Sequence, residues 1–244
     1  SLHEKTGLDN ICITGGVAQN SVVNGKILRN TPFKKMYVPS AGHDAGTSIG
    51  SALYLYNHIL SNERKEEIKT AYFGRKSDNN EVIDCLEKHG VKYEKVNDDI
   101  LFDRVSDKLV DGGVIGWFQG RAEFGPRSLG HRSIIVDPRR KDAKDLLNKK
   151  IKKRESFRPF APSILEEYVE EYFVQNDKVP FMEKVYDIKK EKYSEIPAVT
   201  HVDGTGRLQS VNKEVSPRYY RLISEFHTKT GVPILLNTSF NENE

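Results

Sequence analysis

The stretch GRAEFGPRSLGHRS at residues 120–133 follows VIGWF (114–118), an apolar run that predicts a buried strand. It places Arg121, Arg127 and Arg132 among three glycines and one proline, a composition typical of a loop. Ordering or burying an arginine costs free energy, so a surface loop gains little from three of them. We therefore expect a strand that leads into an arginine-rich loop, and we expect this loop to meet an anion or a partner.

Predicted helices and strands alternate on both sides of this loop. Strands are expected within 8–16, 34–40, 91–96, 114–118, 180–188 and 232–237. Helices are expected within 16–30, 41–60, 78–89, 98–111, 141–152, 164–172 and 217–230. Such alternation is typical of a layered α/β arrangement. We predict a mixed α/β (α+β) fold with two domains, 1–64 and 72–244, and the charged stretch SNERKEEIKT (61–70) as a solvated helix end or linker.

The composition narrows the class of protein. The chain has 244 residues, of which 37% are hydrophobic and 30% charged, and its 38 basic and 35 acidic side chains nearly balance. This balance argues against a nucleic-acid binder, and no apolar run approaches the roughly 20 residues that span a membrane. Cys12 and Cys85 are predicted to be buried thiols, which fits a reducing, cytoplasmic compartment.

A glycine pair is the first chemical signal. TGGVAQN (14–20) places Gly15 and Gly16 between a predicted strand and a predicted helix, and Asn20 follows in the same turn. Backbone amides at such a turn approach a phosphate closely, and the helix N-terminus adds a favourable partial charge. The sequence thus predicts a nucleotide contact at these three residues. The alternative is a tight turn without a ligand.

The second signal is AGHDAGTSIG (41–50), where His43 and Asp44 precede a predicted helix. A carboxylate in this position is a candidate metal ligand, and the alternative is an Asp N-cap. The seven histidines of the chain are scattered, and no two stand four residues apart. A complete metal site therefore does not follow from the sequence.

Further candidates are basic and polar side chains in the second half of the chain. They lie in NKKIKKRESFRPFAPS (148–163), THVDGTGRLQS (200–210) and LLNTSFN (235–241). Guanidinium groups bind phosphate or carboxylate through paired hydrogen bonds, and hydroxyls and amides at the end of a strand complete small anion pockets. The candidate anion-binding residues are Arg121, Arg127, Arg132, Lys152, Arg158, His201, Arg207, Ser239 and Asn241.

Two other interpretations of these basic residues stay open. In the first, Glu123 and Glu155 neutralise Arg121 and Arg158 on a solvated face. In the second, the region is a nucleic-acid surface, which would require spread lysines, interleaved aromatic residues and a strongly basic domain.

The motifs GGVAQN, GHDAGTSIGSA, GWFQGRAEFGPRSLGHRSI, FRPFAPS, THVDGTGRLQ and LNTSFN occur in this order along the chain. In this order they resemble the C-terminal half of carbamoyltransferases of the NodU/CmcH type, which O-carbamoylate small molecules. The resemblance covers nearly the whole chain. It implies that residues 1–64 end an actin/sugar-kinase-like domain, similar to threonylcarbamoyl transferases, and that 72–244 are most of a YrdC-like domain.

The resemblance also implies a reaction in two stages. Carbamoyl phosphate and ATP would form carbamoyl adenylate in the YrdC-like domain, and the carbamoyl group would pass to a small-molecule hydroxyl in the other domain, beside a bound iron. Five residues fall on positions expected to hold carbamoyl phosphate or the phosphates of the nucleotide: Arg127, Lys152, Arg158, Arg207 and Ser239. Of these, Arg127, Lys152 and Arg158 are expected to be catalytic. Asp44 falls on a ligand of iron or another divalent metal.

This sequence departs from the pattern of the family in two respects. The resemblance implies a pair of metal-binding histidines four residues apart, and no such pair is present. The chain also looks like an excised piece, so we expect an incomplete metal site and incomplete activity. Sheet edges left open in this way would favour a homodimer. The alternative function that the resemblance leaves open is a YrdC-like module that binds RNA or a nucleotide.

Overall fold

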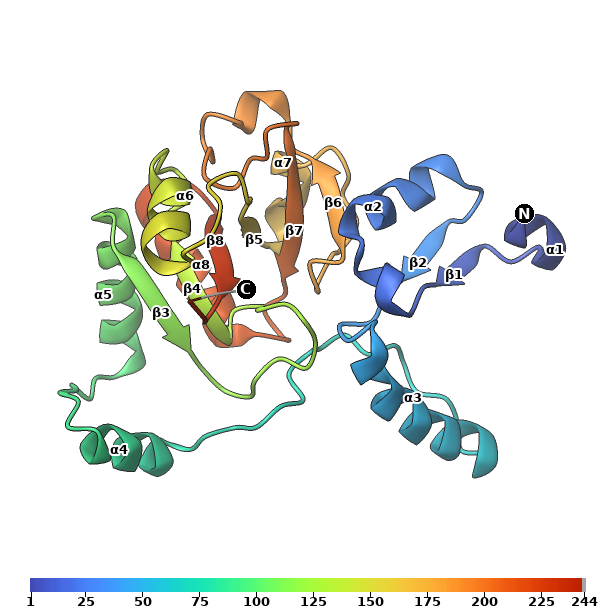
Figure 1. Cartoon of the computed structure of the whole chain (residues 1–244), viewed down its shortest axis with the longest axis horizontal. Coiled ribbons are helices and arrows are strands. Elements are labelled where there is room, and N and C mark those ends of the chain that lie inside the picture. Colours follow the sequence, from blue (N-terminus) through green and yellow to red (C-terminus); the bar gives the residue numbers. More distant parts are fainter. Residues whose placement is uncertain (243–244) are drawn as a thin grey trace.

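The computed structural model describes residues 1–242 of the chain. Its larger part is built on a six-stranded sheet in the order β3-β4-β8-β5-β7-β6 (Figure 1). These strands are β3 (Val114–Phe118), β4 (Arg132–Val136), β5 (Ala161–Leu165), β6 (Lys184–Asp187), β7 (Thr205–Val211) and β8 (Ile234–Ser239). The structure therefore confirms the predicted mixed α+β class.

The sheet is mixed, and its register brings distant parts of the sequence together. β5 pairs with β7 in parallel and with β8 antiparallel, with Ala161 opposite Asn237. Because β8 runs against β5 and β7, its carboxyl end lies beside the beginnings of the other two strands. Three segments remote in sequence thus meet at one end of the sheet.

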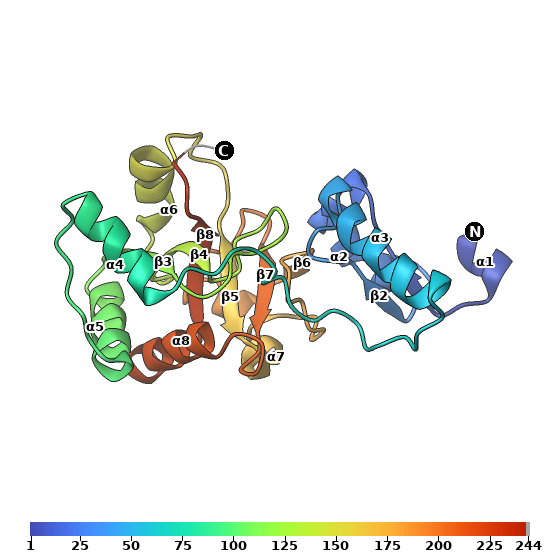
Figure 2. The same cartoon turned by 90° about the horizontal axis from the view of Figure 1, so that it is seen from below.

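Two helices pack against each other and against this sheet. Figure 2 shows α5 (Asp98–Val110) and α8 (Pro217–Thr230) side by side. Asn97 caps α5 by accepting the backbone N–H of Ile100, and Pro217 occupies the first turn of α8. Phe102 of α5 and Phe226 of α8 are fully buried in the main core. The apolar faces of both helices are therefore buried in the core.

The N-terminal part is smaller and more exposed. β1 (Asn10–Cys12) and β2 (Lys35–Tyr37) form a two-stranded parallel sheet accompanied by α1 (Leu2–Thr6), α2 (Ser21–Asn30) and α3 (Thr47–Tyr54). In Figure 1, α2 lies against β6, and α3 extends away from the large sheet. One contact between this part and the larger one is therefore made by α2.

Short elements complete the chain. The remaining helices are α4 (Asn79–Lys88), α6 (Ala143–Leu146) and α7 (Val169–Tyr172). The chain also contains 3₁₀ turns η1 (Gly16–Gln19), η2 (Asp44–Gly46), η5 (Glu166–Tyr168) and η6 (Lys190–Lys192), and π turns η3 (Leu55–Ile59) and η4 (Leu147–Ile151). None of the helices within residues 1–242 is both long and apolar enough to cross a lipid bilayer.

Two predicted elements are wrong. Residues 91–96 form no strand, because this mostly exposed segment finds no partner edge. The helix expected at 164–172 begins only after residue 165, because Ala161–Leu165 are all buried as the strand between β7 and β8. A continuous apolar run fits a buried strand and a buried helix equally well, and here the neighbouring strands decided.

Two predictions of burial are also wrong. Cys12 and Cys85 are both exposed. β1 has only one neighbouring strand to cover it, and α4 buries none of its residues. The run 114–118, predicted as a buried strand, is only partly buried, because β3 lies at the edge of the sheet. Trp117 is buried on one face, whereas Phe118, on the opposite face, is 53% exposed.

Candidate functional site

Four arginines from three separate segments line one cavity of about 200 Å³, which we call the arginine pocket. Arg127 comes from the arginine loop (120–132), Arg154 and Arg158 precede β5, and Arg207 lies near the beginning of β7. Asn237 and Ser239, at the end of β8, complete the lining. The sheet register explains this convergence, since the end of β8 meets the beginnings of β5 and β7. Such a concentration of guanidinium groups favours an anionic ligand.

Lys152 lies behind the wall of the arginine pocket. Its side chain is fully buried at the end of η4, and Nζ donates to Ser239 Oγ at 2.8 Å and to Ser239 O at 2.7 Å. The same ammonium donates to Asn241 Oδ1 at 2.6 Å and to Asn241 O at 3.0 Å. Lys152 therefore fixes the chain at the end of β8 and brings a positive charge close to Ser239.

The arginine loop is held from within by Glu123. Its Oε1 accepts backbone N–H groups from Leu129 at 2.6 Å, His131 at 3.0 Å and Arg132 at 3.3 Å. Glu123 thus holds the backbone of the loop in place. The first alternative had expected an ion pair between Glu123 and Arg121, and this half of it is wrong. The second half of that alternative is correct, because Arg158 Nε lies 3.0 Å from Glu155 Oε2.

A buried amide network anchors the far end of the loop. Asn237 Nδ2 donates to Ser128 O at 3.2 Å and to Gln209 Oε1 at 3.1 Å, and Gln209 Nε2 donates to Leu129 O at 2.9 Å. Ser163 Oγ donates to Gln209 Oε1 at 2.6 Å. Sequence reasoning missed Gln209 and Ser163. Their signal was a polar residue inside an apolar strand, which is informative because buried polar groups require partners.

His131 supports the loop from the other side. Its ring stacks on Tyr72 with centroids 3.5 Å apart, Nδ1 lies 2.7 Å from Arg121 O, and Nε2 lies 3.2 Å from Ser216 Oγ. Burial lowers the pKa of His131 below its usual value, so the ring is neutral near pH 7. In the neutral ring, Nδ1–H donates to the carbonyl and Nε2 accepts from the serine hydroxyl.

The structure places the other predicted anion-binding residues outside the arginine pocket. Arg121 is exposed and donates to Gly74 O at 3.1 Å. The guanidinium of Arg132 donates to Gln119 O and Gly120 O, and it lies over the Phe118 ring with its Cζ 3.5 Å from the centroid. Both side chains therefore tie the base of the loop to its surroundings.

His201 and Asn241 also lie apart from the arginine pocket. His201 Nδ1 is 3.0 Å from Thr205 Oγ1, and its Nε2 is buried with no hydrogen-bond partner among residues 1–242. Asn241 is exposed and contacts Lys152 and Ser239. Asn241 thus contacts Ser239 of the pocket lining without being part of that lining itself.

A second cavity, the glycine-turn pocket of about 540 Å³, lies in the N-terminal part. Gly15, Ser40 and Asp44 are among its lining residues, and Gly15 N–H donates to Gly42 O at 2.6 Å. The side chain of Asn20 caps the N-terminus of α2, where its Oδ1 accepts the N–H of Val23 at 3.1 Å. Gly16 begins η1 and, like Asn20, is not part of the pocket lining.

The metal that the resemblance implies does not fit the residues present. Asp44 is exposed, and the neighbouring His43 turns its Nδ1 towards the N–H of Ala45 at 3.3 Å, so His43 rather than Asp44 caps the turn. Within residues 1–242, no three His, Cys, Asp or Glu side chains gather closely enough to hold a metal ion.

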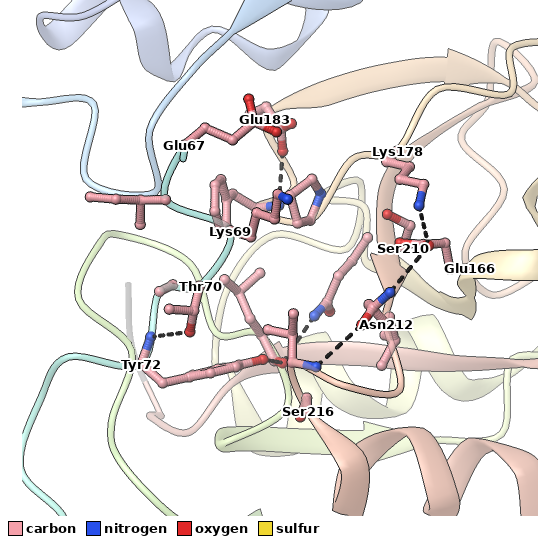
Figure 3. A pocket seen from close by; sticks show the side chains of 18 of the residues that line it. Glu67, Lys69, Thr70, Tyr72, Glu166, Lys178, Glu183, Ser210, Asn212 and Ser216 are labelled. Atoms are coloured by element: carbon pink, nitrogen blue, oxygen red, sulfur yellow. Dashed lines mark hydrogen bonds and ion pairs between the residues drawn. The ribbon is translucent and has the colours of Figure 1, made fainter. Parts of the chain in front are cut away.

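A third cavity, the linker cavity of about 360 Å³, separates residues 67–72 from the sheet (Figure 3). Glu166 in its wall pairs with Lys178 at 2.6 Å and accepts from Asn212 Nδ2 at 3.2 Å. Burial raises the pKa of Glu183 to about 7. Carboxylates outnumber ammonium groups in this lining, so the linker cavity does not suit phosphate, whereas the arginine pocket does.

Two regions of the chain match known protein families. Residues 1–53 match the family described as Carbamoyltransferase N-terminus, and residues 106–244 match Carbamoyltransferase C-terminus, the latter being more than half of the chain. This chain belongs to the carbamoyltransferase family. Gly15 and Asp44 lie in the first matched region, and all four pocket arginines lie in the second.

Several carbamoyltransferase relatives are similar over nearly the whole chain. Nodulation protein NolO of Bradyrhizobium diazoefficiens is 42% identical over 99% of this chain and 45% of its own length. Nodulation protein NolNO of Sinorhizobium fredii is 43% identical over 98% of this chain and 36% of its own length. The 3'-hydroxymethylcephem-O-carbamoyltransferase of Amycolatopsis lactamdurans is 31% identical over 95% of this chain and 42% of its own length. The chain thus spans less than half of the length of each of these relatives.

Proposed function

We propose that this protein takes part in ATP-dependent O-carbamoyl transfer and that its arginine pocket binds the phosphates of carbamoyl phosphate and ATP. One observation carries the proposal. Arg127, Arg158 and Arg207 come from segments far apart in sequence, yet they line a single small pocket together with Ser239. These four positions are among the five, with Lys152, that the family resemblance assigns to the binding of carbamoyl phosphate or the phosphates of the nucleotide.

The electrostatics of the pocket suit this role. Carbamoyl phosphate and ATP are both anions and repel each other, so bringing their reacting atoms together requires fixed positive charge. Arg127, Arg154 and Arg207 supply it, and Arg158 adds a guanidinium whose charge Glu155 partly offsets. Groups that are already oriented stabilise developing charge without reorganising during the reaction. Removing one such contact typically costs about 10²–10³ in rate.

The proposed reaction balances as follows. Water cleaves carbamoyl phosphate to carbamate and inorganic phosphate, and a carbamate oxygen attacks the α-phosphorus of ATP and releases pyrophosphate. The acceptor hydroxyl then attacks the carbamoyl carbon of carbamoyl adenylate, loses its proton and displaces AMP. In this proposal, the arginine pocket serves the first stage by holding phosphoryl groups, and Lys152 keeps Ser239 in place beside them.

A small-molecule hydroxyl is the proposed acceptor. The name of the cephem relative specifies a hydroxymethyl group as the site of carbamoylation, and this relative is similar to 95% of the present chain. For the glycine-turn pocket, we retain a nucleotide contact at Gly15 as part of the proposal, since its volume suits a small molecule.

Isothermal titration calorimetry with carbamoyl phosphate tests the assignment of the arginine pocket. Arg127→Ala removes a guanidinium from the pocket lining, and we expect its affinity to fall about tenfold or more, since hydrogen bonds to charged groups contribute about 1.5–3 kcal/mol.

Arg121→Ala is the matched control, because it removes an exposed arginine of the same loop that lies outside the pocket. Its affinity should equal that of the wild type. If both variants lost the same affinity for carbamoyl phosphate, the loss would reflect the overall positive charge of the protein and not the arginine pocket. Unchanged binding by Arg127→Ala would refute the assignment.

A further inference from the structure

The arginine loop touches the N-terminal part of the chain just before Arg127. Ser40 Oγ donates a hydrogen bond to Phe124 O at 3.1 Å. At the next residue, Gly125, an added Cβ would lie 2.4 Å from Ser40 O and 2.9 Å from Ser40 C. The two backbones therefore meet without any intervening side chain.

Gly125 is required by this contact for two reasons. Its φ of +146° lies in a region that side-chain-bearing residues rarely adopt, and its missing Cβ leaves the space that Ser40 O occupies. Any other residue at this position would strain the backbone and push the two segments apart. The position lies two residues before Arg127, so such a displacement would reach the pocket.

Ser40 is itself held firmly on its own side. The next residues, Ala41 and Gly42, are buried, and Gly42 O accepts the N–H of Gly15 at 2.6 Å. The carbonyl of Ala41 packs against Gly46, where an added Cβ would approach to 2.0 Å. Ser40 therefore presents a fixed hydroxyl and a fixed carbonyl to the arginine loop.

The rest of the loop is fixed on both sides of this contact. Glu123 binds three backbone N–H groups of the loop, Phe124 N–H donates to Ala71 O at 2.7 Å, and Asn237 binds Ser128 O. Between these anchors, the stretch 125–127 has the Ser40 contact as its support from the N-terminal part. The backbone that leads into Arg127 thus lies directly against Ser40.

We propose that Ser40 and Gly125 form a positioning contact through which the N-terminal part of the chain helps to orient Arg127 in the arginine pocket. This inference rests on the proposed function, because it takes the arginine pocket to bind an anion. It assigns Ser40 a role that the sequence motifs TGGVAQN (14–20) and GRAEFGPRSLGHRS (120–133) had not suggested.

A double-mutant cycle read by calorimetry with carbamoyl phosphate tests the contact on the full 244-residue chain. Ser40→Ala should weaken binding about three- to tenfold, the usual scale of one net hydrogen bond. The same change in an Arg127→Ala background should have no further effect, because Ser40 acts through Arg127. In an Arg121→Ala background, the full loss should persist.

Two further variants separate positioning from general damage. Ser40→Thr keeps the hydroxyl and should retain wild-type affinity, whereas Gly125→Ala should weaken binding more than Ser40→Ala. Ser48→Ala is the control within the N-terminal part. The Ser48 hydroxyl donates to Ala45 O of the adjacent turn η2 at 2.9 Å, so its loss should leave the affinity unchanged.

The outcomes keep this inference and the proposed function apart. If the wild type binds no carbamoyl phosphate, or if Arg127→Ala binds as the wild type does, the proposed function fails. If Arg127→Ala loses affinity while Ser40→Ala does not, only the positioning contact is overturned. An equal effect of Ser40→Ala with and without Arg127 would also overturn it.

Discussion

Two charged side chains of the interior, Lys152 and Glu183, have opposite surroundings. Lys152 Nζ meets oxygen atoms of Ser239 and Asn241, so its hydrogen bonds to water are replaced. Glu183 Oε2 accepts the N–H of Phe181 at 2.8 Å, but burial still raises its pKa to about 7. Nearby Lys184 lowers this pKa and Asp177 raises it, and neither outweighs the loss of water. Residue identity alone therefore does not decide the charge state.

Glu183 should make the stability of the protein depend on pH. Its pKa lies near 7 in the folded state against 4.5 when exposed, so the folded protein keeps a proton that the unfolded chain releases. The free energy of unfolding should therefore fall as pH rises through this window. Glu183→Gln should flatten the dependence and stabilise the protein by about 1–3 kcal/mol near pH 8. Urea denaturation across this range measures both effects.

The exposed residue Glu170 offers a control for this experiment. Glu170→Gln should leave the pH profile of the wild type intact. A profile of Glu183→Gln that still falls between about pH 5 and pH 7 would show that another group carries the dependence.

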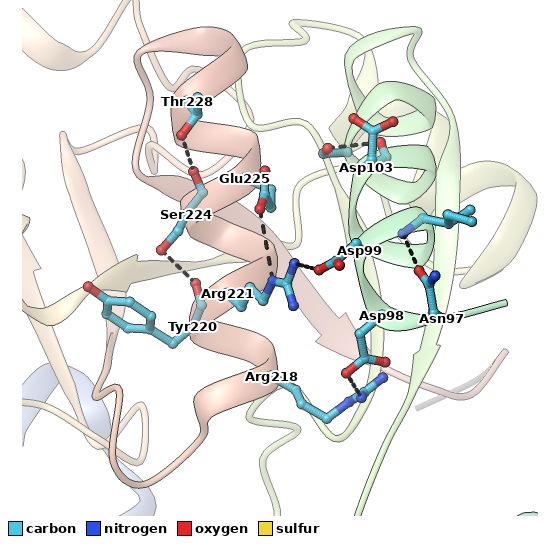
Figure 4. A network of polar contacts seen from close by, with 12 residues as sticks. Asn97, Asp98, Asp99, Asp103, Arg218, Tyr220, Arg221, Ser224, Glu225 and Thr228 are labelled. Atoms are coloured by element: carbon cyan, nitrogen blue, oxygen red, sulfur yellow. Dashed lines mark hydrogen bonds and ion pairs between the residues drawn. The ribbon is translucent and has the colours of Figure 1, made fainter.

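At the scale of elements, α5 and α8 are joined by an apolar seam and by ion pairs along its edge. Figure 4 shows Arg221 of α8 between Asp99 of α5 and Glu225 of its own helix. Further along, Lys229 Nζ lies 2.6 Å from Asp103 Oδ1 and 2.5 Å from Asp107 Oδ1, and its side chain is only 24% exposed. A networked, partly covered ion pair contributes more than an isolated exposed one.

Replacing Lys229 tests the contribution of this network. Lys229→Met keeps the apolar stem and removes the charge, so we expect a loss of about 1 kcal/mol in the free energy of unfolding at low salt. About 1 M salt should shrink this loss, because it screens the pairs. Chemical denaturation at two salt concentrations measures the difference.

Arg104→Met is the comparison for Lys229→Met, because Arg104 makes an exposed pair with Glu94 at 2.7 Å. This isolated pair should contribute about 0.5 kcal/mol or less. Equal losses in the two variants would argue that networking adds nothing here.

At the scale of the whole molecule, α2 holds the N-terminal part against β6. Asn24 is buried, and its Nδ2 donates to Ala18 O at 2.7 Å and to Glu183 O at 2.9 Å. Arg29 pairs with Asp187 at 2.6 Å. At Gly25, an added Cβ would lie 2.0 Å from Val185 O, so helix and strand touch backbone to backbone. The packing of the N-terminal part against the larger part therefore depends on this close approach.

Gly25→Ala should loosen that union. The new methyl group meets Val185 O, so we expect α2 to shift and the exposed linker around Arg64 and Lys65 to be cleaved faster by trypsin. Gly50→Ala is the matched control, because its Cβ meets no atom within 4 Å and it lies in α3. Similar cleavage of both variants would show that the α2–β6 contact does not limit opening.

The sequence by itself determined the elements whose signals are local. The helix at 217–230 was predicted with its observed bounds, because Pro217 and Gly231 mark its ends and an apolar stripe fills the interval. The mixed class followed from the alternation of such signals. For the same reason, order-specific motifs sufficed to indicate the carbamoyltransferase family, since side-chain chemistry is written in the chain itself.

Only the tertiary structure decided which residues share a pocket. Arg121 and Arg127 look equivalent in one loop, yet only Arg127 lines the arginine pocket, because Glu123 and Asn237 fix how that loop turns. The strand at 161–165 likewise depends on β7 and β8 on either side. Strand pairing and the contact of Ser40 with Gly125 join residues far apart in the chain, and no local preference encodes such distances.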